Sequence, residues 1–453
     1  MSDSGSATSS ELKRFDSSLG HHLFVADGSR IFDIDAALAA ALDDALHGRT
    51  TRDASSLLGL DGAERRWIDG NPAAPPPVSA ISLNVAQVCN MACGYCYADE
   101  GRFGGKARIM PLSVARQTVD RLIEDAAPGA ELLLGFMGGE PLLNRALIHE
   151  IVPYAVRQGV LTGHRFRFSL TTNATLLTEA DAILFREFPF IVQISIDGPP
   201  DINDAQRPLR NGQGSYRHVL DGLRLFAQHG RPGQLSARVT ITRKSRNLLG
   251  ILDHLIGLGF DDVGFSLALV SPDPKLAVQV EDFSGLLREM MGCGEKCRSE
   301  LSVGRSYPFG NFLTALEEIH RGTHRPYPCG AGAAYLSANA EGRLYACHRL
   351  VDDDAFLMGD IWRGSDDRVR QRHLERRHVD QMDPCRRCWA RYLCGGGSYH
   401  EVAKRGRPGC DFIRGWLEYC LMAYTELSAV SPHGLFGRQD GLNAASDIAI
   451  FAS

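Results

Sequence analysis

Three cysteines crowd into one short stretch of the sequence, CNMACGYCYADEG, and their spacing points to chemistry. Cys89, Cys93 and Cys96 are separated by three and two residues, and a tyrosine stands on each side of the last one. Iron–sulfur clusters are usually held by four cysteines, so three thiolates leave one iron open for another ligand. A structural zinc site needs four closed ligands, and no fourth Cys or His lies nearby. The open three-thiolate cluster is therefore the favoured prediction.

A second and larger group of cysteines lies near the C-terminal end. Seven of the twelve cysteines fall between Cys329 and Cys420, and the two that remain are Cys293 and Cys297. The polar N-terminus lacks a signal-peptide pattern, so a cytosolic location is expected, where cysteines more often bind metal or act in catalysis than form disulfides. Because the cysteines are clustered and not scattered along the chain, metal binding is favoured over a purely structural role. Cys293 and Cys297 are spaced i, i+4, which fits one face of a helix, and packing is the favoured interpretation.

Length and composition bound the class of protein. The chain has 453 residues, which predicts two to four domains, and 44% apolar with 23% charged residues is typical of a globular protein. The net charge is −5 and basic residues form no long run, so neither nucleic-acid nor membrane-surface binding is indicated. No apolar run approaches the roughly 18 residues of a membrane span.

Alternating strands and helices must position the first cysteine group. Strands are predicted at 81–86, 131–137, 166–172, 191–197, 236–242 and 262–269. Helices are predicted to start near Pro111, Asn144, Thr178, Ser215 and Asn247. Such alternation predicts βαβ units and a parallel sheet, either a partial (β/α)6 barrel or, as the alternative, a doubly wound sheet. Chemistry then sits at the carboxyl ends of the strands, and Cys89 lies just past the first one.

The barrel is expected to span residues 81–275, with further units before and after it in the chain. Before it we predict a disordered lead (1–19), a small unit of two strands and helices (20–70) with a turn at Asp27-Gly28, and a Pro-rich linker (71–80). After it we predict a helical linker (276–328), a Cys-rich domain (329–425) with a hairpin at Glu341-Gly342, and a tail (426–453). A Gly- and Cys-rich domain builds little core, so bound metal is expected to help hold it together.

The Cys89–Cys96 motif after a first strand resembles the radical S-adenosylmethionine superfamily. The resemblance implies a [4Fe–4S] cluster held by Cys89, Cys93 and Cys96, whose open iron binds S-adenosylmethionine. One-electron reduction then yields a 5′-deoxyadenosyl radical that takes a hydrogen atom from the substrate. The resemblance also implies cofactor-binding residues, placed next to the cluster or along successive strands: Tyr95, Gly138, Gly139, Glu140, Ser169, Asn173, Ser195, Asp197 and Arg238.

The second cysteine group resembles the SPASM extension of this superfamily, which carries auxiliary [4Fe–4S] clusters. It implies a first auxiliary site with Cys329 and Cys347, and a second with Cys385, Cys388 and Cys394. Ser398 stands where the family has a cysteine of the first site. A serine oxygen is a poorer match for iron–sulfur, so Ser398 as a ligand, substitution by Cys293 or Cys297, an open iron and loss of the cluster all stay open.

The last ligand of the second auxiliary site is one of two cysteines. Cys410 follows a turn and is preferred, whereas Cys420 lies in a helical pattern and is equally compatible with a buried core thiol. Two histidines, His348 and His400, lie close to these motifs. We interpret both as structural groups rather than ligands.

Several C-terminal segments resemble peptide maturases that install thioether crosslinks, notably those acting on the small subunit of quinohemoprotein amine dehydrogenase. The resemblance implies an oxidoreductase that joins a Cys sulfur to carbon in a ribosomally made peptide, with a flavodoxin- or ferredoxin-type reductant. The 20–70 unit is compatible with a peptide-recognition element that captures a leader by strand addition. Sulfatase (formylglycine-generating) and carbon–carbon crosslinking maturases are the alternatives. A non-catalytic iron–sulfur electron carrier or zinc-binding scaffold is an alternative of another class.

Overall fold

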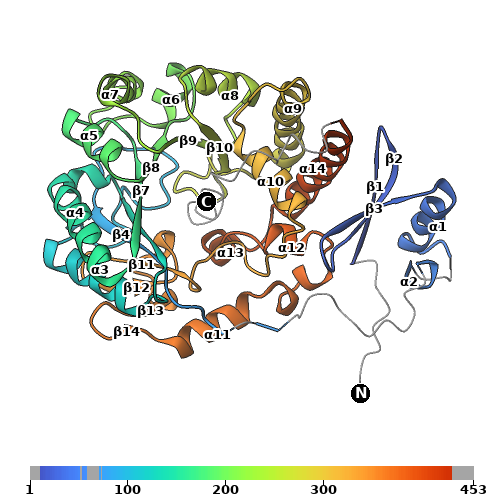
Figure 1. Cartoon of the computed structure of the whole chain (residues 1–453). Coiled ribbons are helices and arrows are strands. Elements are labelled where there is room, and N and C mark those ends of the chain that lie inside the picture. Colours follow the sequence, from blue (N-terminus) through green and yellow to red (C-terminus); the bar gives the residue numbers. More distant parts are fainter. Residues whose placement is uncertain (1–10, 51–53, 59–70, 73, 431–453) are drawn as a thin grey trace.

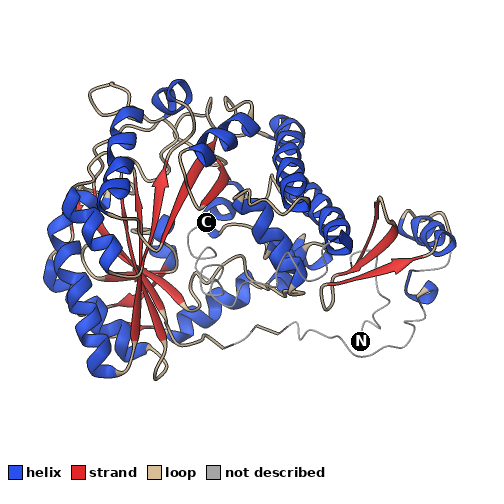
Figure 2. Ribbon diagram, turned by 45° about the horizontal axis from the view of Figure 1, so that its top comes forward, coloured by secondary structure: helices blue, strands red, loops and turns tan. Residues whose placement is uncertain are grey.

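The protein is built around one long sheet that runs from the barrel strands into the Cys-rich region. The computed structural model describes residues 11–50, 54–58, 71–72 and 74–430. Within this part of the chain one sheet has eleven strands and a separate sheet has three. Helices α3, α4, α5, α7 and α8 lie along the outer side of the long sheet (Figure 1), and its strands fan out between helices (Figure 2).

Six parallel strands form the barrel wall, and each lies beside its neighbour in the chain. The strands are β4 (Ala80–Gln87), β6 (Glu131–Gly138), β7 (Arg165–Thr172), β8 (Phe190–Ser195), β9 (Gln234–Ile241) and β10 (Asp262–Leu267). The helices between them are α3 (Leu112–Asp125), α4 (Arg145–Thr162), α5 (Glu179–Glu187), α6 (Pro200–Gln206), α7 (Tyr216–His229) and α8 (Leu248–Gly257). A short strand of two residues, β5 (Arg108–Ile109), pairs antiparallel with β4. The predicted partial barrel is confirmed, with a short helix, α6, that the sequence did not predict.

The barrel core lies between the strands and the outer helices. Phe136, Phe168 and Phe190 come from the neighbouring strands β6, β7 and β8, and their rings stack with centroids 6.4 and 5.1 Å apart. Phe185 of α5 packs against Phe190 at 4.6 Å. Aromatic pairs in this range add packing energy beyond the area they bury. They fix the register of three strands, and so the relative positions of the strand ends.

The Cys-rich region is attached directly to the first barrel strand. β11 (Tyr335–Ala338) pairs in parallel with β4, and β12 (Arg343–Tyr345), β13 (Leu357–Asp360) and β14 (Gly364–Ser365) follow antiparallel. Buried hydrogen bonds cross the junction: the Ser82 hydroxyl donates to Ser337 at 2.9 Å, and the Asn84 amide donates to Ser337 at 2.8 Å. The predicted hairpin is present, and its pairing with β4, which extends the barrel sheet, was not predicted.

Helices close the side of the barrel that the strands leave open. They are α9 (Phe283–Ser302), α10 (Gly310–His320) and α14 (Cys410–Val430), with the shorter α11 (Asp367–Arg377), α12 (Arg391–Cys394) and α13 (Tyr399–Arg405) nearby (Figure 1). Asn311 of α10 binds the backbone of Phe265 in both directions, at 2.7 and 2.9 Å, and so caps the free edge of β10. The predicted tail is wrong at its start, because α14 continues to Val430; residues 431–453 lie outside the described residues.

The N-terminal unit is a three-stranded antiparallel sheet with two helices. It contains β1 (Leu12–Ser17), β2 (Gly20–Val25), β3 (Arg30–Ile34), α1 (Ala36–Leu46) and α2 (Ala54–Leu57). The prediction of a disordered lead is wrong for residues 12–17, because Leu12 and Phe15 are buried when β1 pairs with β2. The polar residues between them hid this strand in the sequence. The rest of the lead up to residue 10, and the helical piece predicted beyond residue 58, lie outside the described residues.

Ionic contacts join the N-terminal unit to the Cys-rich region. Arg391 is nearly fully buried and pairs with Glu11 at 2.6 Å and with Asp380 at 3.1 Å. Glu426 of α14 accepts a hydrogen bond from the Ser18 backbone N–H at 2.8 Å. The unit is thus fixed to the main body. Among the described residues, no helix is both long and apolar enough to cross a bilayer.

Candidate active site

The loop that carries the first three cysteines follows β4 and is held by a second segment of backbone. The Ala92 N–H donates to the Pro208 carbonyl at 2.9 Å, and the Arg210 N–H donates to the Asn90 carbonyl at 3.3 Å. The second segment follows α6, the helix that the sequence did not predict. Backbone pairing of this kind fixes the loop independently of any bound metal.

Glycines let this loop approach the end of the neighbouring strand β6. A Cβ on Gly101, which has φ +92°, would lie 2.5 Å from the Cα of Gly139, and a Cβ on Gly139 would lie 2.4 Å from the Val88 carbonyl oxygen. Gly139 N–H donates to the Ala86 carbonyl at 2.8 Å. Two backbone segments therefore approach so closely here that only glycine fits. These contacts draw β4, β6 and the cysteine loop together.

A cavity of about 210 Å³ lies where the cysteine loop meets the strand ends. All three thiols, of Cys89, Cys93 and Cys96, line it. The predicted cofactor-binding residues that also line it are Tyr95, Gly138, Gly139, Asn173, Ser195 and Arg238. Residues from β6, β7, β8 and β9 thus converge on one space, as expected for the carboxyl edge of a parallel sheet.

Glu140 does not line this cavity. Its side chain is fully buried, and its carboxylate accepts hydrogen bonds from the Thr172 hydroxyl at 2.7 Å and the Asn173 backbone N–H at 2.8 Å. The Leu142 backbone N–H donates to it at 3.0 Å. Burial raises the pKa of Glu140, while these hydrogen bonds oppose the shift. The structure thus shows Glu140 as a clamp between the ends of β6 and β7.

Two other predicted residues also lie away from the cavity wall. Asp197 is buried and accepts hydrogen bonds from the Tyr95 hydroxyl at 2.7 Å and the Thr240 backbone N–H at 3.0 Å. Asp197 therefore orients the Tyr95 side chain without lining the cavity itself. Ser169 lies inside β7, and the cavity is lined further along that strand by Thr171 and Thr172.

Arg207 is a residue at this cavity that sequence reasoning missed. It is 7% exposed, lines the cavity beside the three thiols and donates to the Tyr95 hydroxyl, while its Nε has no hydrogen-bond partner. A buried guanidinium needs a negative partner nearby. Asp197 supplies part of that charge. Arg207 stands just after α6, and only knowledge of that helix would have pointed to it.

The donor set fits an open iron–sulfur cluster. Burial raises the pKa of Cys89 to about 12 and raises that of Cys93, so iron must displace protons from these thiols when it binds. Within the described residues no three His, Cys, Asp or Glu side chains gather tightly enough for one metal ion. A cubane places its thiolates on separate irons, farther apart than the ligands of one ion. The Arg207 guanidinium, whose Nε has no hydrogen-bond partner, suits the negative charge of such a cluster.

Four cysteines of the second group surround a smaller cavity of about 70 Å³. They are Cys385, Cys388, Cys394 and Cys410. Arg407 Nε donates to the Cys385 sulfur at 3.3 Å, and the Arg414 side chain hydrogen-bonds Cys388. Four thiols with two guanidinium groups match a closed four-iron site. The structure brings Cys410 to this set and leaves Cys420 fully buried within α14.

Cys329 and Cys347 lie together at a different place, beside the larger cavity that Ser398 also lines. Cys394 lines this cavity too, but its neighbouring thiols are Cys385, Cys388 and Cys410. Cys293 and Cys297 are fully buried in α9, and the Cys297 thiol donates to the Tyr307 carbonyl at 3.2 Å. The structure thus separates this helical pair from the first auxiliary position.

The two histidines near these motifs are buried. His348 shares a hydrogen bond with the Tyr335 hydroxyl at 3.1 Å, and burial lowers its pKa to about 3. Burial also lowers the pKa of His400 to about 4. Both are neutral at physiological pH, and both line the cavity of about 210 Å³ beside the first three cysteines.

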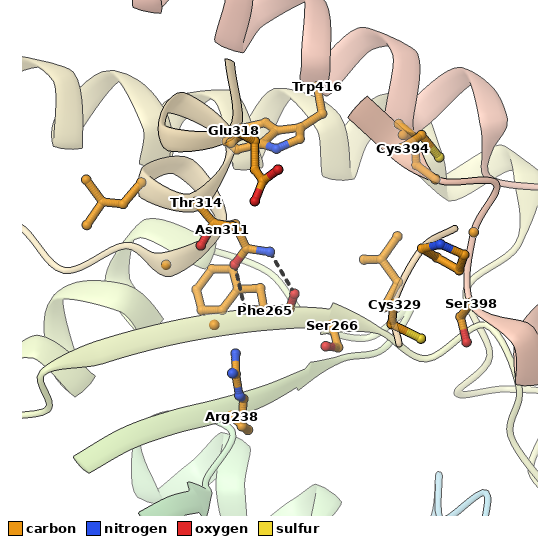
Figure 3. A pocket seen from close by; sticks show the side chains of 18 of the residues that line it. Arg238, Phe265, Ser266, Asn311, Thr314, Glu318, Cys329, Cys394, Ser398 and Trp416 are labelled. Atoms are coloured by element: carbon orange, nitrogen blue, oxygen red, sulfur yellow. Dashed lines mark hydrogen bonds between the residues drawn. The ribbon is translucent and has the colours of Figure 1, made fainter. Parts of the chain in front are cut away.

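A larger cavity of about 600 Å³ joins the cysteine-loop cavity to the Cys-rich region. Gln193, Arg238, Ser266, Arg349 and Glu401 line both spaces. Figure 3 shows Arg238 pointing into the larger cavity from β9, Glu318 pointing into it from α10, and Cys329 beside Ser398 at one end. The cofactor cavity is therefore open on one side to a space bounded by two domains.

Comparison with known proteins identifies the family. The family model of the Radical SAM superfamily matches residues 83–247. An uncharacterised protein of Methanocaldococcus jannaschii is 31% identical over 46% of this chain and 70% of the relative. A serine-type anaerobic sulfatase-maturating enzyme of Klebsiella aerogenes is 27% identical over 62% of this chain and 69% of its own.

Solved structures share the fold. The structure of anSMEcpe with bound AdoMet and the Kp18Cys peptide matches with a TM-score of 0.65 at 20% identity, over 79% of this chain and 100% of that chain. Streptococcus suis SuiB bound to S-adenosylmethionine matches with a TM-score of 0.54 at 14% identity, over 88% and 96%. This chain belongs to the radical SAM superfamily, and its cofactors are S-adenosylmethionine and iron–sulfur clusters.

Proposed function

We propose that this radical SAM enzyme is a maturase that modifies a residue within a polypeptide, by joining a cysteine sulfur to a carbon of the same chain. The substrate in this proposal is a Cys-containing peptide or small protein subunit, such as the small subunit of quinohemoprotein amine dehydrogenase. A flavodoxin- or ferredoxin-type protein supplies electrons.

The observation that carries the proposal is the pair of joined cavities. The space beside the three thiols measures about 210 Å³, and it opens into one of about 600 Å³. The larger volume is in the range of sites that bury a sizeable ligand. Because barrel and Cys-rich domain both line it, a polypeptide segment entering there reaches the strand ends while the two domains exclude water around it.

Polar groups in the larger cavity suit a polypeptide ligand. Glu318 is buried at 5% exposure, and its Oε2 accepts no hydrogen bond although Arg325 Nε lies 3.5 Å away. Trp416 of α14 offers an aromatic wall on the same side (Figure 3). Backbone N–H groups of an extended peptide are suitable donors for such a carboxylate, and aromatic walls suit its side chains.

The bound cofactors supply one-electron hydrogen-atom abstraction and an acceptor for the surplus electron. The chain's own residues bind the cofactor and the substrate and orient them. Asp197 holds the Tyr95 hydroxyl, Arg207 places positive charge beside the thiols, and Arg238 presents its guanidinium to both cavities. Forming a carbon–sulfur bond removes one hydrogen from carbon and one from sulfur, so the product is lighter by two hydrogen atoms.

A second candidate is oxidation of a Ser or Cys side chain in a sulfatase. It is favoured by relatives named as serine-type and cysteine-type anaerobic sulfatase-maturating enzymes, at 27% and 28% identity. This chain differs in length from the solved neighbour. The anSMEcpe chain is matched over its whole length by 79% of this chain, so this chain carries segments beyond that structure.

The N-terminal sheet is the proposed docking site for a leader segment of the substrate. β3 is one of the two outer strands of this sheet, and among the described strands it pairs only with β2. Phe32 on β3 is 48% exposed. An extended peptide adds to such an edge through backbone hydrogen bonds, and an exposed aromatic offers it a side-chain contact.

Mass spectrometry of the modified polypeptide tests the proposal. Two substrates are incubated with reduced holoenzyme and S-adenosylmethionine: a Cys-rich polypeptide encoded beside this chain's gene, and the Kp18Cys peptide. A product lighter by two hydrogen atoms, with one fewer alkylatable thiol, is expected from the first. An aldehyde that reacts with a hydrazide probe, formed from the second, favours sulfatase-type oxidation instead. Cofactor cleavage with both polypeptides unchanged contradicts the proposal.

A further inference from the structure

The cysteine count leaves one expected cluster site short of ligands. All twelve cysteines are among the described residues. Three line the cofactor cavity, four surround the small cavity of the Cys-rich region, and three are fully buried in α9 and α14. The remaining two, Cys329 and Cys347, lie at the position where the family resemblance implies a first auxiliary cluster. Cys394 also lines their cavity, but it belongs to the set of four around the small cavity.

The side chains that the structure places around Ser398 include no third thiol of their own. Ser398 begins α13 and makes no capping hydrogen bond. Tyr399 follows it at 2% exposure, and its hydroxyl has no partner. The guanidinium of Arg377 stacks over the Tyr399 ring at 4.3 Å, and His373 packs against the same ring at 4.9 Å. Neutral oxygens and a cation are poor ligands for iron in a sulfur cluster.

The other cysteines are committed elsewhere. Cys394 lines the same cavity, but it is grouped with Cys385, Cys388 and Cys410. Cys293 and Cys297 lie in the apolar core of α9, and the Cys297 thiol is already bonded to a carbonyl. Cys420 is buried in the same core from α14. An open cluster is expected to need three thiolates, as at Cys89, Cys93 and Cys96. Cys329 and Cys347 supply only two.

The position is open to the substrate cavity. Cys329, Cys347, Ser398 and Tyr399 all line the 600 Å³ space, and Figure 3 shows the Cys329 sulfur directed toward Ser398 at its end. Protein therefore does not fill the place where a cluster would sit. A polypeptide in the cavity has access to it, and the unpartnered Tyr399 hydroxyl is available to one of its acceptors.

We propose that this chain binds two four-iron clusters, one at Cys89, Cys93 and Cys96 and one at Cys385, Cys388, Cys394 and Cys410. Cys329 and Cys347 are then free thiols at the end of the substrate cavity. The proposal concerns cofactor content alone and holds whichever residue the enzyme modifies.

Iron and sulfide content of the anaerobically reconstituted full chain tests the proposal, with Mössbauer spectroscopy to identify the cluster type. We expect about eight iron atoms per chain. The double variant C329A/C347A should keep all of them, whereas C385A/C388A should lose about four. About twelve iron atoms in the wild type, or any loss of iron from C329A/C347A, overturns the proposal.

Substitution of Ser398 provides a second test that does not threaten folding, because its side chain caps no helix. Ser398→Cys restores a third thiol, and we expect iron to rise from about eight to about twelve atoms per chain. The matched variant Ser398→Ala should leave it unchanged. Loss of iron from Ser398→Ala identifies the serine oxygen as a ligand and overturns the proposal. Equal iron in wild type and Ser398→Cys overturns the missing thiol as the cause.

Discussion

At the scale of single residues, the structure separates groups that face the cofactor cavity from groups that hold its wall. Tyr95 and Arg238 line the cavity, whereas Asp197 and Glu140 stand behind it. The sequence motif could not make this distinction, because a conspicuous carboxylate at a strand end suits either role. Only the hydrogen-bond partners of Glu140 show that its oxygens are already used by Thr172 and by backbone.

Glu140→Gln tests the clamp role. The NH2 group of the glutamine would face either the Asn173 N–H or, with the amide turned round, the Thr172 and Leu142 donors, so we expect a loss of about 3 kcal/mol of stability. This lowers the thermal midpoint by about 5 °C, with and without S-adenosylmethionine. Glu150→Gln, an exposed glutamate of α4, is the control and should change little. An unchanged midpoint with weaker binding of S-adenosylmethionine supports direct contact with the cofactor and contradicts the clamp.

At the scale of elements, the sequence predicted what is local and missed what depends on distant partners. The six barrel strands follow from apolar runs between turn signals, and each lies within two residues of its predicted start. β1 was missed because Lys13 and Arg14 separate the two residues that it buries. The pairing of β11 with β4 was missed because it joins segments about 250 residues apart, and no local pattern records a register. α6 was missed because its seven residues begin with Pro200 and carry little apolar periodicity.

Helix α5 shows how one residue fixes an element. Asp181 is buried, and its carboxylate closes a capping box with Thr178 and pairs with Arg145 at 2.8 Å and His149 at 2.9 Å. Burial opposes ionisation of Asp181, but the hydrogen bonds from His149, Thr178 and Arg145 outweigh it and lower its pKa. A lowered pKa in the folded state means that the ionised group stabilises the fold above the unfolded value of about 4.

Asp181→Asn should therefore destabilise the protein by about 3 kcal/mol at neutral pH. The difference from wild type should shrink as pH falls below about 4, where the wild-type carboxylate also takes up a proton. Thermal unfolding of both proteins across this range measures it. The matched control is Glu179→Gln, in the first turn of the same helix but exposed. A difference that is the same at every pH would show that the charge of Asp181 contributes nothing.

At the scale of the whole molecule, the N-terminal unit is part of the main body. Phe15 and Phe24 belong to the same buried core as the barrel, and Arg391 would lose its partner Glu11 if the unit were removed. Deleting the unit therefore tests stability and substrate capture together. Point substitutions on the free edge of β3 separate the two.

Phe32→Ser is the appropriate substitution for substrate capture. We expect the dissociation constant for the precursor polypeptide to rise about tenfold, the effect of losing one apolar contact of about 1.4 kcal/mol. Cleavage of S-adenosylmethionine without substrate should be unchanged. Leu19→Ser, equally exposed but in the turn between β1 and β2, is the control. Equal weakening by both variants, or by neither, contradicts docking at β3.

The central claim is that Cys89, Cys93 and Cys96 hold the cluster that activates S-adenosylmethionine, and one measurement tests it most directly. Wild type and the triple variant C89A/C93A/C96A are reduced with dithionite, and 5′-deoxyadenosine is quantified beside bound iron. The wild type should form 5′-deoxyadenosine. The variant should form none while retaining about four iron atoms at Cys385, Cys388, Cys394 and Cys410. A triple variant that still produces 5′-deoxyadenosine would contradict the account.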